Sequence, residues 1–278
     1  MDLRNFDALS SEGYKAQTRS NWTAAPCGSN YSEHPFMSRP YFEEIEAYRY
    51  GTHPWLLEKI RSFSLEGKKV LEIGYGMGTD HLALARQGGV MHGIDLTPGN
   101  KDITQGRFDL YGFSTDLVVD DAENMPFADA SFDFVYSFGV VHHAPSTEKV
   151  IREVYRVLKP GGRCWIAVYN RSSLYFWWTL FLVQYLLKGG FRKRTLQQQV
   201  SLLEYPNDNE NLVVRLYRPA EFERLFAPFS SREREVSHLL PANLQILQRL
   251  FPDPERPRTW LDALGRRLGW YVAVEAVK

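Results

Sequence analysis

Cysteine is scarce in this chain, and neither sign of charge predominates. Cys27 and Cys164 are the only two cysteines in 278 residues, which is too few for a disulfide framework or a cysteine-based zinc site. The first residues, MDLRNFDALSSEGYK, also carry no apolar run of the kind that directs secretion. We therefore expect two buried thiols, a cytoplasmic location and no metal site. The 33 Lys and Arg residues balance 33 Asp and Glu residues, so we expect no nucleic-acid partner.

An apolar run long enough to cross a bilayer is missing as well. The most hydrophobic stretch is 174–187, LYFWWTLFLVQYLL, and as a helix it would be about 21 Å long against a bilayer core of roughly 30 Å. Three uses are open for it: packing on the domain, forming the wall of an apolar pocket, or lying at a membrane surface. Peripheral membrane contact would then involve 174–194, with the basic residues 192–194 at the lipid head groups.

Strand-like apolar runs alternate with helical patterns between Lys68 and Val168, which is typical of βαβ units in a parallel sheet. Strands are predicted at 68–73, 90–95, 114–121, 132–137 and 162–169. Helices are predicted at 79–87, 101–112 and 147–158. In the last of these, Val150, Val154, Val157 and Leu158 share one face, and the sequence Lys-Pro-Gly-Gly at 159–162 ends the helix.

The segments on either side of this core are less regular. Residues 1–67 form an arm rich in aromatics and proline, with a helical part at 40–60 that should break near Gly51 and Pro54. Residues 68–278 are interpreted as one α/β domain, in which a helix is expected at 218–226 and strands at 233–239 and 269–277. This domain carries an apolar insertion at 171–216 and a second insertion at 239–268.

A glycine-rich turn, Glu-Ile-Gly-Tyr-Gly-Met-Gly-Thr at 72–79, follows the first predicted strand. Glycine permits a positive φ and lets a ligand lie against the backbone. The spacing is G-x-G-x-G, unlike the G-x-G-x-x-G of dinucleotide folds. Glu72 would repel a phosphate but suits a cationic ligand, and Asp95, 21 residues after Gly74, suits ribose hydroxyls. Together they indicate a nucleoside with a positively charged tail.

At this point the chain resembles the class I S-adenosylmethionine-dependent methyltransferases, and specifically their methyltransferase type 11 group. The resemblance is carried, in this order, by VLEIGYGMGTD, GIDLTP, DDAENMPFADASFDFVYS and VHHAPSTEKVIREVYRVLKPGGR. It implies a Rossmann-like sheet of seven strands in the order 3-2-1-4-5-7-6, whose last, antiparallel strand would be 269–277. It also implies S-adenosyl-L-methionine as the cofactor.

The resemblance further assigns residues to the parts of this cofactor. Those expected around the methionine part are Glu72, Gly74, Gly76 and Gly78, and the backbone of Phe138 and Gly139 would meet its amino group. Asp95 would hold the ribose, and the adenine would lie against Leu96, Asp121 and Ala122. The arm folds over the cofactor as a lid in similar enzymes, which makes Tyr41 and Arg49 candidates for contact with its carboxylate. Tyr75 departs from the small residue common at that position.

Two histidines follow the fourth predicted strand, where the acceptor of the methyl group should lie. An in-line displacement needs the acceptor atom on the far side of the methyl from sulfur, above the ends of the fourth and fifth strands. An imidazole can take a proton from a hydroxyl, a thiol or a carbon acid, so His142 and His143 are the candidate general bases. The alternative is that they are histidines of the pocket wall.

The predicted function is methyl transfer to a small, hydrophobic metabolite of quinone-like, isoprenoid or polyketide type. No N/D-P-P-Y/F sequence follows the fourth strand, which speaks against methylation of nucleic-acid bases. The alternatives are a cofactor-binding partner subunit without transfer activity, a methyltransferase acting on protein, and a dinucleotide oxidoreductase. The acceptor atom and the oligomeric state stay open at this level.

Overall fold

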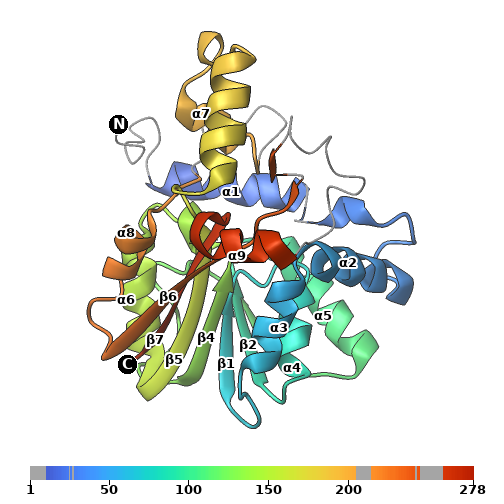
Figure 1. Cartoon of the computed structure of the whole chain (residues 1–278). Helices are drawn as coiled ribbons and strands as arrows, with labels where there is room; N and C mark the ends of the chain where they lie inside the picture. The colour runs from blue at the N-terminus through green and yellow to red at the C-terminus, as the bar shows by residue number, and fades with distance from the viewer. Residues whose placement is uncertain (1–10, 25, 27, 205–213, 242, 245–258) are drawn as a thin grey trace.

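A seven-stranded sheet forms the centre of the protein (Figure 1). The computed structural model describes residues 11–24, 26, 28–204, 214–241, 243–244 and 259–278. The strand order is β3-β2-β1-β4-β5-β7-β6, which confirms the predicted topology. The strands are β1 Lys69–Ile73, β2 Val90–Asp95, β3 Thr115–Val119, β4 Phe132–Phe138, β5 Leu158–Tyr169, β6 Ser231–Ser237 and β7 Tyr271–Val277.

Helices cover both faces of this sheet. In Figure 1, α6 and α8 lie on one side, and α3, α4 and α5 lie on the other. The α-helices are α1 Ser11–Ala24, α2 Arg39–Thr52, α3 Pro54–Ser62, α4 Thr79–Ala85, α5 Pro98–Tyr111, α6 Thr147–Val157, α7 Leu196–Ser201, α8 Pro219–Arg224 and α9 Thr259–Leu268. The 3-10 helices are η1 Ser29–Tyr31, η2 Val141–His143 and η4 Gly190–Arg192, and η3 Tyr175–Leu187 is a π-helix.

Successive residues of the central strands point to opposite faces of the sheet, and both faces are buried. Ile166 of β5 packs in the cluster that includes α6 and α8. Its neighbour Trp165 packs in the cluster that includes α3 and α4. Double burial of this kind explains why the strands read as continuous apolar runs instead of alternating with polar residues.

The direction of the strands brings several strand ends to one edge. β1 runs parallel to β2 and β4, β2 parallel to β3, and β4 parallel to β5. β7 is antiparallel to both β5 and β6. The carboxyl ends of β1, β2, β4 and β5 therefore meet at the same edge, beside Tyr271 at the start of β7, which pairs with Tyr169.

Most predicted elements are present, with shifted ends. The expected break in the arm lies at His53, because α2 ends at Thr52 and Pro54 starts α3. The predicted helix 147–158 is α6, whose first turn is capped by Ser146. β5 begins at Leu158 and not at 162, because Leu158 pairs with Phe132 before the register shifts.

The apolar stretch 174–187 forms the π-type helix η3, whose last turn contains a bond from the Lys188 N–H to the Val183 carbonyl at 2.9 Å. One face, with Phe176, Leu180 and Val183, is buried. Among the described residues, no helix is long and apolar enough to cross a membrane. Of the two cysteines, Cys164 is buried in β5 with a free thiol, whereas Cys27 lies outside the described residues.

Candidate functional site

A cavity of about 630 Å³ opens at the carboxyl edge of the sheet, a size typical of small-molecule sites. One end is formed by the glycine loop after β1 and by the ends of β2 and β3. The other end is formed by aromatic residues near the ends of β5 and the start of β7. Helix α1 closes one side, because Tyr14, Lys15, Thr18 and Trp22 also belong to the lining.

Most of the site residues that the sequence singles out line this one cavity. They are Arg49, Glu72, Gly74, Gly76, Asp95, Leu96, Asp121, Ala122, Phe138, Gly139 and His143. Tyr41, Gly78 and His142 are not part of the lining. Tyr41 is instead buried, and its hydroxyl donates to the Ser29 carbonyl at 3.3 Å. Gly78 caps α4 and packs against Thr104.

Gly74 and Gly76 are required for different physical reasons. Both have a positive φ, of 77° and 52°. A Cβ on Gly74 would lie 2.3 Å from a methyl group of Val140, so this glycine is needed for packing. A Cβ on Gly76 would meet no atom within 4 Å, and Gly76 lines the cavity. The loop at Gly76 is therefore a cradle in which a ligand can touch the backbone.

Asp95 connects this loop to the end of β2. Its carboxylate accepts hydrogen bonds from the backbone N–H of Gly76 at 3.0 Å and of Thr97 at 2.8 Å, and from the side-chain amide of Asn100 at 3.2 Å. Burial nevertheless raises the pKa of Asp95. A carboxylate has about four acceptor positions, so Asp95 can hold the loop and still accept a hydroxyl of a ligand.

Glu72 is engaged by a buried histidine beneath the loop. Its Oε2 lies 2.8 Å from Nδ1 of His81, and Nε2 of His81 lies 2.7 Å from the Thr115 hydroxyl. Burial raises the pKa of Glu72 well above its ordinary range and lowers the pKa of His81 to about 3. A cation in the cavity would oppose this shift and favour ionisation of Glu72.

Arg49 is held at the cavity wall by a buried carboxylate. Its Nε donates to Asp80 at 2.7 Å, its Nη2 donates to the same group, and the guanidinium lies 5.1 Å from the centre of the Phe138 ring. Tyr50 and Tyr136 each donate to Asp80 at 2.9 Å. Burial opposes ionisation, but the charge and hydrogen bonds of Arg49 hold the pKa of Asp80 below its ordinary range.

Helix α1 contributes a group that the sequence analysis missed. Nζ of Lys15 lies 2.5 Å from Oδ2 of Asp121 and 3.1 Å from Oε2 of Glu123, and Nε of Arg19 donates to the Leu96 carbonyl at 3.1 Å. Burial opposes the shift, but these carboxylates raise the pKa of Lys15. The spacing of four between Tyr14, Thr18 and Trp22 was the available signal for a helix facing a cavity.

The far end of the cavity is aromatic. The ring of Tyr169 stacks on Trp270 with centroids 4.5 Å apart, and Tyr175 meets Trp270 edge-on at 4.8 Å. His53 stacks on His238 at 4.4 Å. Burial lowers the pKa of His53 to about 3, so this histidine adds no charge at neutral pH. This end suits an apolar or flat ligand.

The two neighbouring histidines of η2 have different surroundings. His143 lines the cavity. His142 is fully buried behind it, and neither of its ring nitrogens has a hydrogen-bond partner among the described residues. Burial, His143 and Arg215 lower the pKa of His142 well below its ordinary value. Of the two predicted general-base candidates, His143 is the one that lines the cavity.

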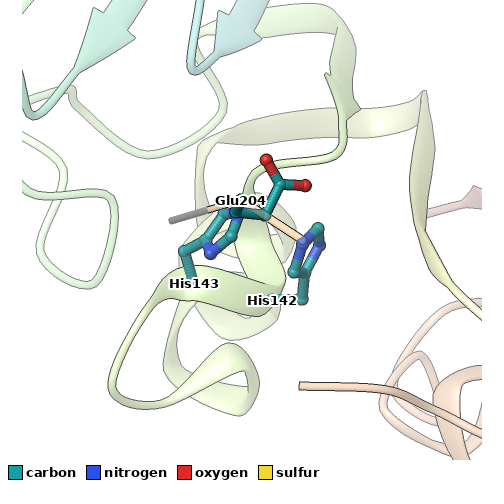
Figure 2. Close-up of side chains that lie close together, drawn as sticks. All are labelled: His142, His143 and Glu204. Atoms are coloured by element: carbon teal, nitrogen blue, oxygen red, sulfur yellow. The ribbon is translucent and has the colours of Figure 1, made fainter. Parts of the chain in front are cut away.

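Glu204 joins these two histidines (Figure 2). One ligand atom from each of His142, His143 and Glu204 can be chosen so that all lie within 4.8 Å of one another. The Tyr169 hydroxyl donates to Oε1 of Glu204. Glu204 comes 61 residues after His143, inside the predicted insertion, so no local spacing could have predicted the cluster.

Sequence comparisons relate part of the chain to known methyltransferases. Residues 71–166 match the family model described as a methyltransferase domain. The phthiotriol/phenolphthiotriol dimycocerosates methyltransferase of Mycobacterium leprae (strain TN) is 36% identical over 135 residues, which are 48% of this chain and 48% of that protein. This chain thus spans about half the length of that relative.

Solved structures resemble the fold at low sequence identity. A Thermotoga maritima protein described as an S-adenosylmethionine-dependent methyltransferase, possibly of histamine, superposes with a TM-score of 0.53 at 18% identity, covering 87% of this chain and 99% of that one. The [4+2]-cyclase SpnF superposes with a TM-score of 0.54 at 17% identity, covering 98% of this chain and 97% of that one.

The strand order, the open glycine loop and these matches define a class I S-adenosylmethionine-dependent methyltransferase fold. Within that class, the match to the family model described as a methyltransferase domain covers residues 71–166.

Proposed function

We propose that this protein transfers the methyl group of S-adenosylmethionine to a small, hydrophobic metabolite. The observation that carries the proposal is the single cavity that joins the open loop at Gly76 to the aromatic end near Tyr169 and Trp270. A cofactor and an acceptor can therefore meet inside one space. The relative described as a phthiotriol/phenolphthiotriol dimycocerosates methyltransferase supports a small-molecule acceptor.

The residues at the first end fit the cofactor part by part. When bound, S-adenosylmethionine supplies an activated methyl group, and the protein supplies binding and alignment. The loop at Gly74 and Gly76 would surround the methionine part, beside the Arg49 guanidinium. Asp95 would accept the ribose hydroxyls, and Leu96, Asp121 and Ala122 would enclose the adenine. Lys15 would fix this last wall, because it links α1 to Asp121.

The residues at the second end would orient the acceptor. His143 lines the cavity beyond η2, so its imidazole is the group best placed to take a proton from an acceptor hydroxyl. The rings of Tyr169, Tyr175 and Trp270 would hold the apolar body of the acceptor. The apolar insertion thereby combines two of its three predicted uses, since η3 packs on the domain and its first residue, Tyr175, lines the cavity.

Two measurements test the proposal. Calorimetric titration with S-adenosylhomocysteine should give one site per chain, and Asp95→Leu should abolish that binding because it removes the acceptor of three hydrogen bonds. Incubation with methyl-labelled S-adenosylmethionine and a panel of quinols, isoprenoid alcohols and polyketides should move label into an organic extract. Absence of cofactor binding would overturn the proposal.

Cofactor binding without methyl transfer is the second candidate function. The superposition with SpnF, which covers nearly the whole chain, shows that this fold also occurs in a protein described as a cyclase. Binding of S-adenosylhomocysteine with no label transferred to any acceptor, including proteins, would favour this alternative over the first.

Contact with an anionic membrane surface is a further part of the proposal. Beyond the buried face of η3, Trp177, Leu187 and Phe191 are 49%, 67% and 50% exposed. The exposed basic residues Lys188 and Arg192 flank them, and this combination is typical of interfacial helices. The full chain should co-sediment with phosphatidylserine vesicles more than with phosphatidylcholine vesicles, and Leu187→Asp should reduce this binding.

The domain boundary and the compartment also belong to the proposal. We propose a lid-forming arm at residues 1–67 and a methyltransferase domain at 68–278. The start of β1 at Lys69 supports this division. The free, buried thiol of Cys164 supports a reducing compartment such as the cytoplasm.

A further inference from the structure

The cluster at the acceptor end of the cavity holds more ionisable groups than the proposed methyl transfer uses, because that transfer uses His143 alone. His143 and Glu204 line the cavity, and His142 is buried behind them. It combines the imidazoles of His142 and His143 with the carboxylate of Glu204, and their ligand atoms all lie within 4.8 Å of one another. Figure 2 shows the three side chains converging from η2 and from the segment after α7. Burying the two histidines beside the half-buried Glu204 costs free energy unless a partner compensates for the lost hydration.

His142 provides independent evidence for such a partner. The residue is fully buried, and both ring nitrogens lack a hydrogen-bond partner among the described residues. Buried polar groups are almost always satisfied, and each exception requires an explanation. The ring of Tyr169 lies 4.5 Å from that of His142, and its hydroxyl donates to Oε1 of Glu204.

We propose that His142, His143 and Glu204 bind a divalent transition-metal ion at the acceptor end of the cavity. Two imidazole nitrogens and one carboxylate oxygen form the ligand set of catalytic zinc sites and of non-haem iron sites, which keep one or more positions open. Zinc bonds to such ligands are about 2.0–2.2 Å long, so tetrahedral ligands lie about 3.3 Å apart. The side chains therefore close by about 1.5 Å or less as the ion binds.

Surrounding residues have the roles expected around a metal ligand. The Tyr169 hydroxyl donates to Glu204, which would orient the carboxylate in the way that outer partners of metal ligands do. The guanidinium of Arg215 donates to the carbonyls of Ala144 and Pro145, just beyond η2. The carboxylate of Glu204 supplies the negative charge that a cation requires beside this arginine.

The ion would determine which acceptors the protein accepts. This step rests on the proposed function. The open coordination position of the ion would face the cavity, because His143 and Glu204 line it. A divalent ion binds oxygen donors and lowers the pKa of a bound hydroxyl. The acceptor class is therefore an apolar molecule with a hydroxyl or carboxyl oxygen. With the ion bound, both imidazoles are ligands, and activation of the acceptor passes from His143 to the metal.

The test measures metal binding on the full chain, without cofactor or acceptor. After treatment with a chelator, the protein is titrated with Zn²⁺ in a calorimeter and with Co²⁺ in a spectrophotometer. We expect one ion per chain and the visible absorption of a low-coordinate Co²⁺ ion. Glu204→Gln and His142→Asn should each lower the affinity by more than 100-fold, and Tyr169→Phe should lower it about 10–100-fold.

A matched control separates the cluster from ordinary surface histidines. His34→Ala removes a histidine whose side chain is 54% exposed beside Glu44, and its Zn²⁺ affinity should equal that of the unaltered protein. Thermal melting of each variant checks folding, and Tyr169→Phe, which removes a single hydroxyl, tests the site if His142→Asn does not fold. Zn²⁺ affinity that is unchanged in Glu204→Gln and Tyr169→Phe would overturn the proposal.

These measurements distinguish failure of the metal-site proposal from failure of the proposed function. If S-adenosylhomocysteine binds while Zn²⁺ and Co²⁺ do not, the metal site is wrong and the cofactor site stands. If the metals bind and S-adenosylhomocysteine does not, the metal site stands and the proposed function is wrong.

Discussion

Replacing Gly74 and Gly76 separately by alanine should affect two different properties, although the chemical change is identical. Alanine at Gly74 adds left-handed strain of about 1–2 kcal/mol. It also overpacks Val140, because the new Cβ would lie 2.3 and 2.5 Å from its two methyl groups and 2.9 Å from its Cβ. Rotation of Val140 cannot relieve all three contacts, so overpacking adds about 1–3 kcal/mol.

The sum for Gly74→Ala is a loss of about 2–5 kcal/mol in the free energy of unfolding, and the melting temperature should fall by about 4–20 °C. Gly76→Ala carries the strain of about 1–2 kcal/mol alone, because nothing lies within 4 Å of its Cβ. The added methyl group occupies the cradle, so affinity for S-adenosylhomocysteine should fall about 5–150-fold, which corresponds to about 1–3 kcal/mol.

Urea unfolding and calorimetric titration of the two variants measure both quantities. Val140→Ala in the Gly74→Ala background should recover about 1–3 kcal/mol relative to the sum of the single changes, as expected for residues in contact. Two results would refute these roles of the glycines: Gly76→Ala binding S-adenosylhomocysteine like the unaltered protein, or Val140→Ala failing to rescue stability.

Three other residues allow direct tests. Lys15→Met should weaken S-adenosylhomocysteine about 5–10-fold and increase amide hydrogen exchange in α1, because Lys15 binds Asp121 and Glu123; unchanged exchange would contradict the assigned role. Asp80→Asn should cost about 1.5–3 kcal/mol of stability, because it leaves the partly exposed Arg49 without its counter-charge and the buried Tyr50 and Tyr136 without a charged acceptor. Glu148→Gln at the exposed pair with Arg152 should cost less than about 0.5 kcal/mol. Burial lowers the pKa of His53 from 6.5 to about 3, so the unfolded chain binds a proton that the folded chain does not, and stability should fall as pH drops from 6.5 toward 3. This residue contributes up to about 1.4 kcal/mol per pH unit to the slope of the free energy of unfolding against pH. His53→Gln should reduce that slope in urea titrations between about pH 7 and pH 5. A slope equal to that of the unaltered protein would refute the assignment.

Local sequence patterns determined the helices and strands and their order along the chain. The helix α6 is readable from the spacing of Val150, Val154 and Val157, because one helical face packs on the sheet. The open loop at Gly76 and the carboxylate at Asp95 are readable because strand, glycine turn and following strand are close in sequence. Residues of this kind lie within one βαβ unit, whose geometry is nearly the same wherever it occurs.

Only the tertiary structure decided which distant groups meet. Lys15 reaches Asp121 from a helix 106 residues earlier, and nothing in the sequence around either residue specifies that distance. Glu204 approaches His142 and His143 only because η3 and α7 return the chain over the cavity. His142 and His143 are identical side chains in adjacent positions, yet one is sealed in the core and the other lines the cavity. Burial and contact between separate segments depend on the packing of the whole chain, which no local pattern encodes.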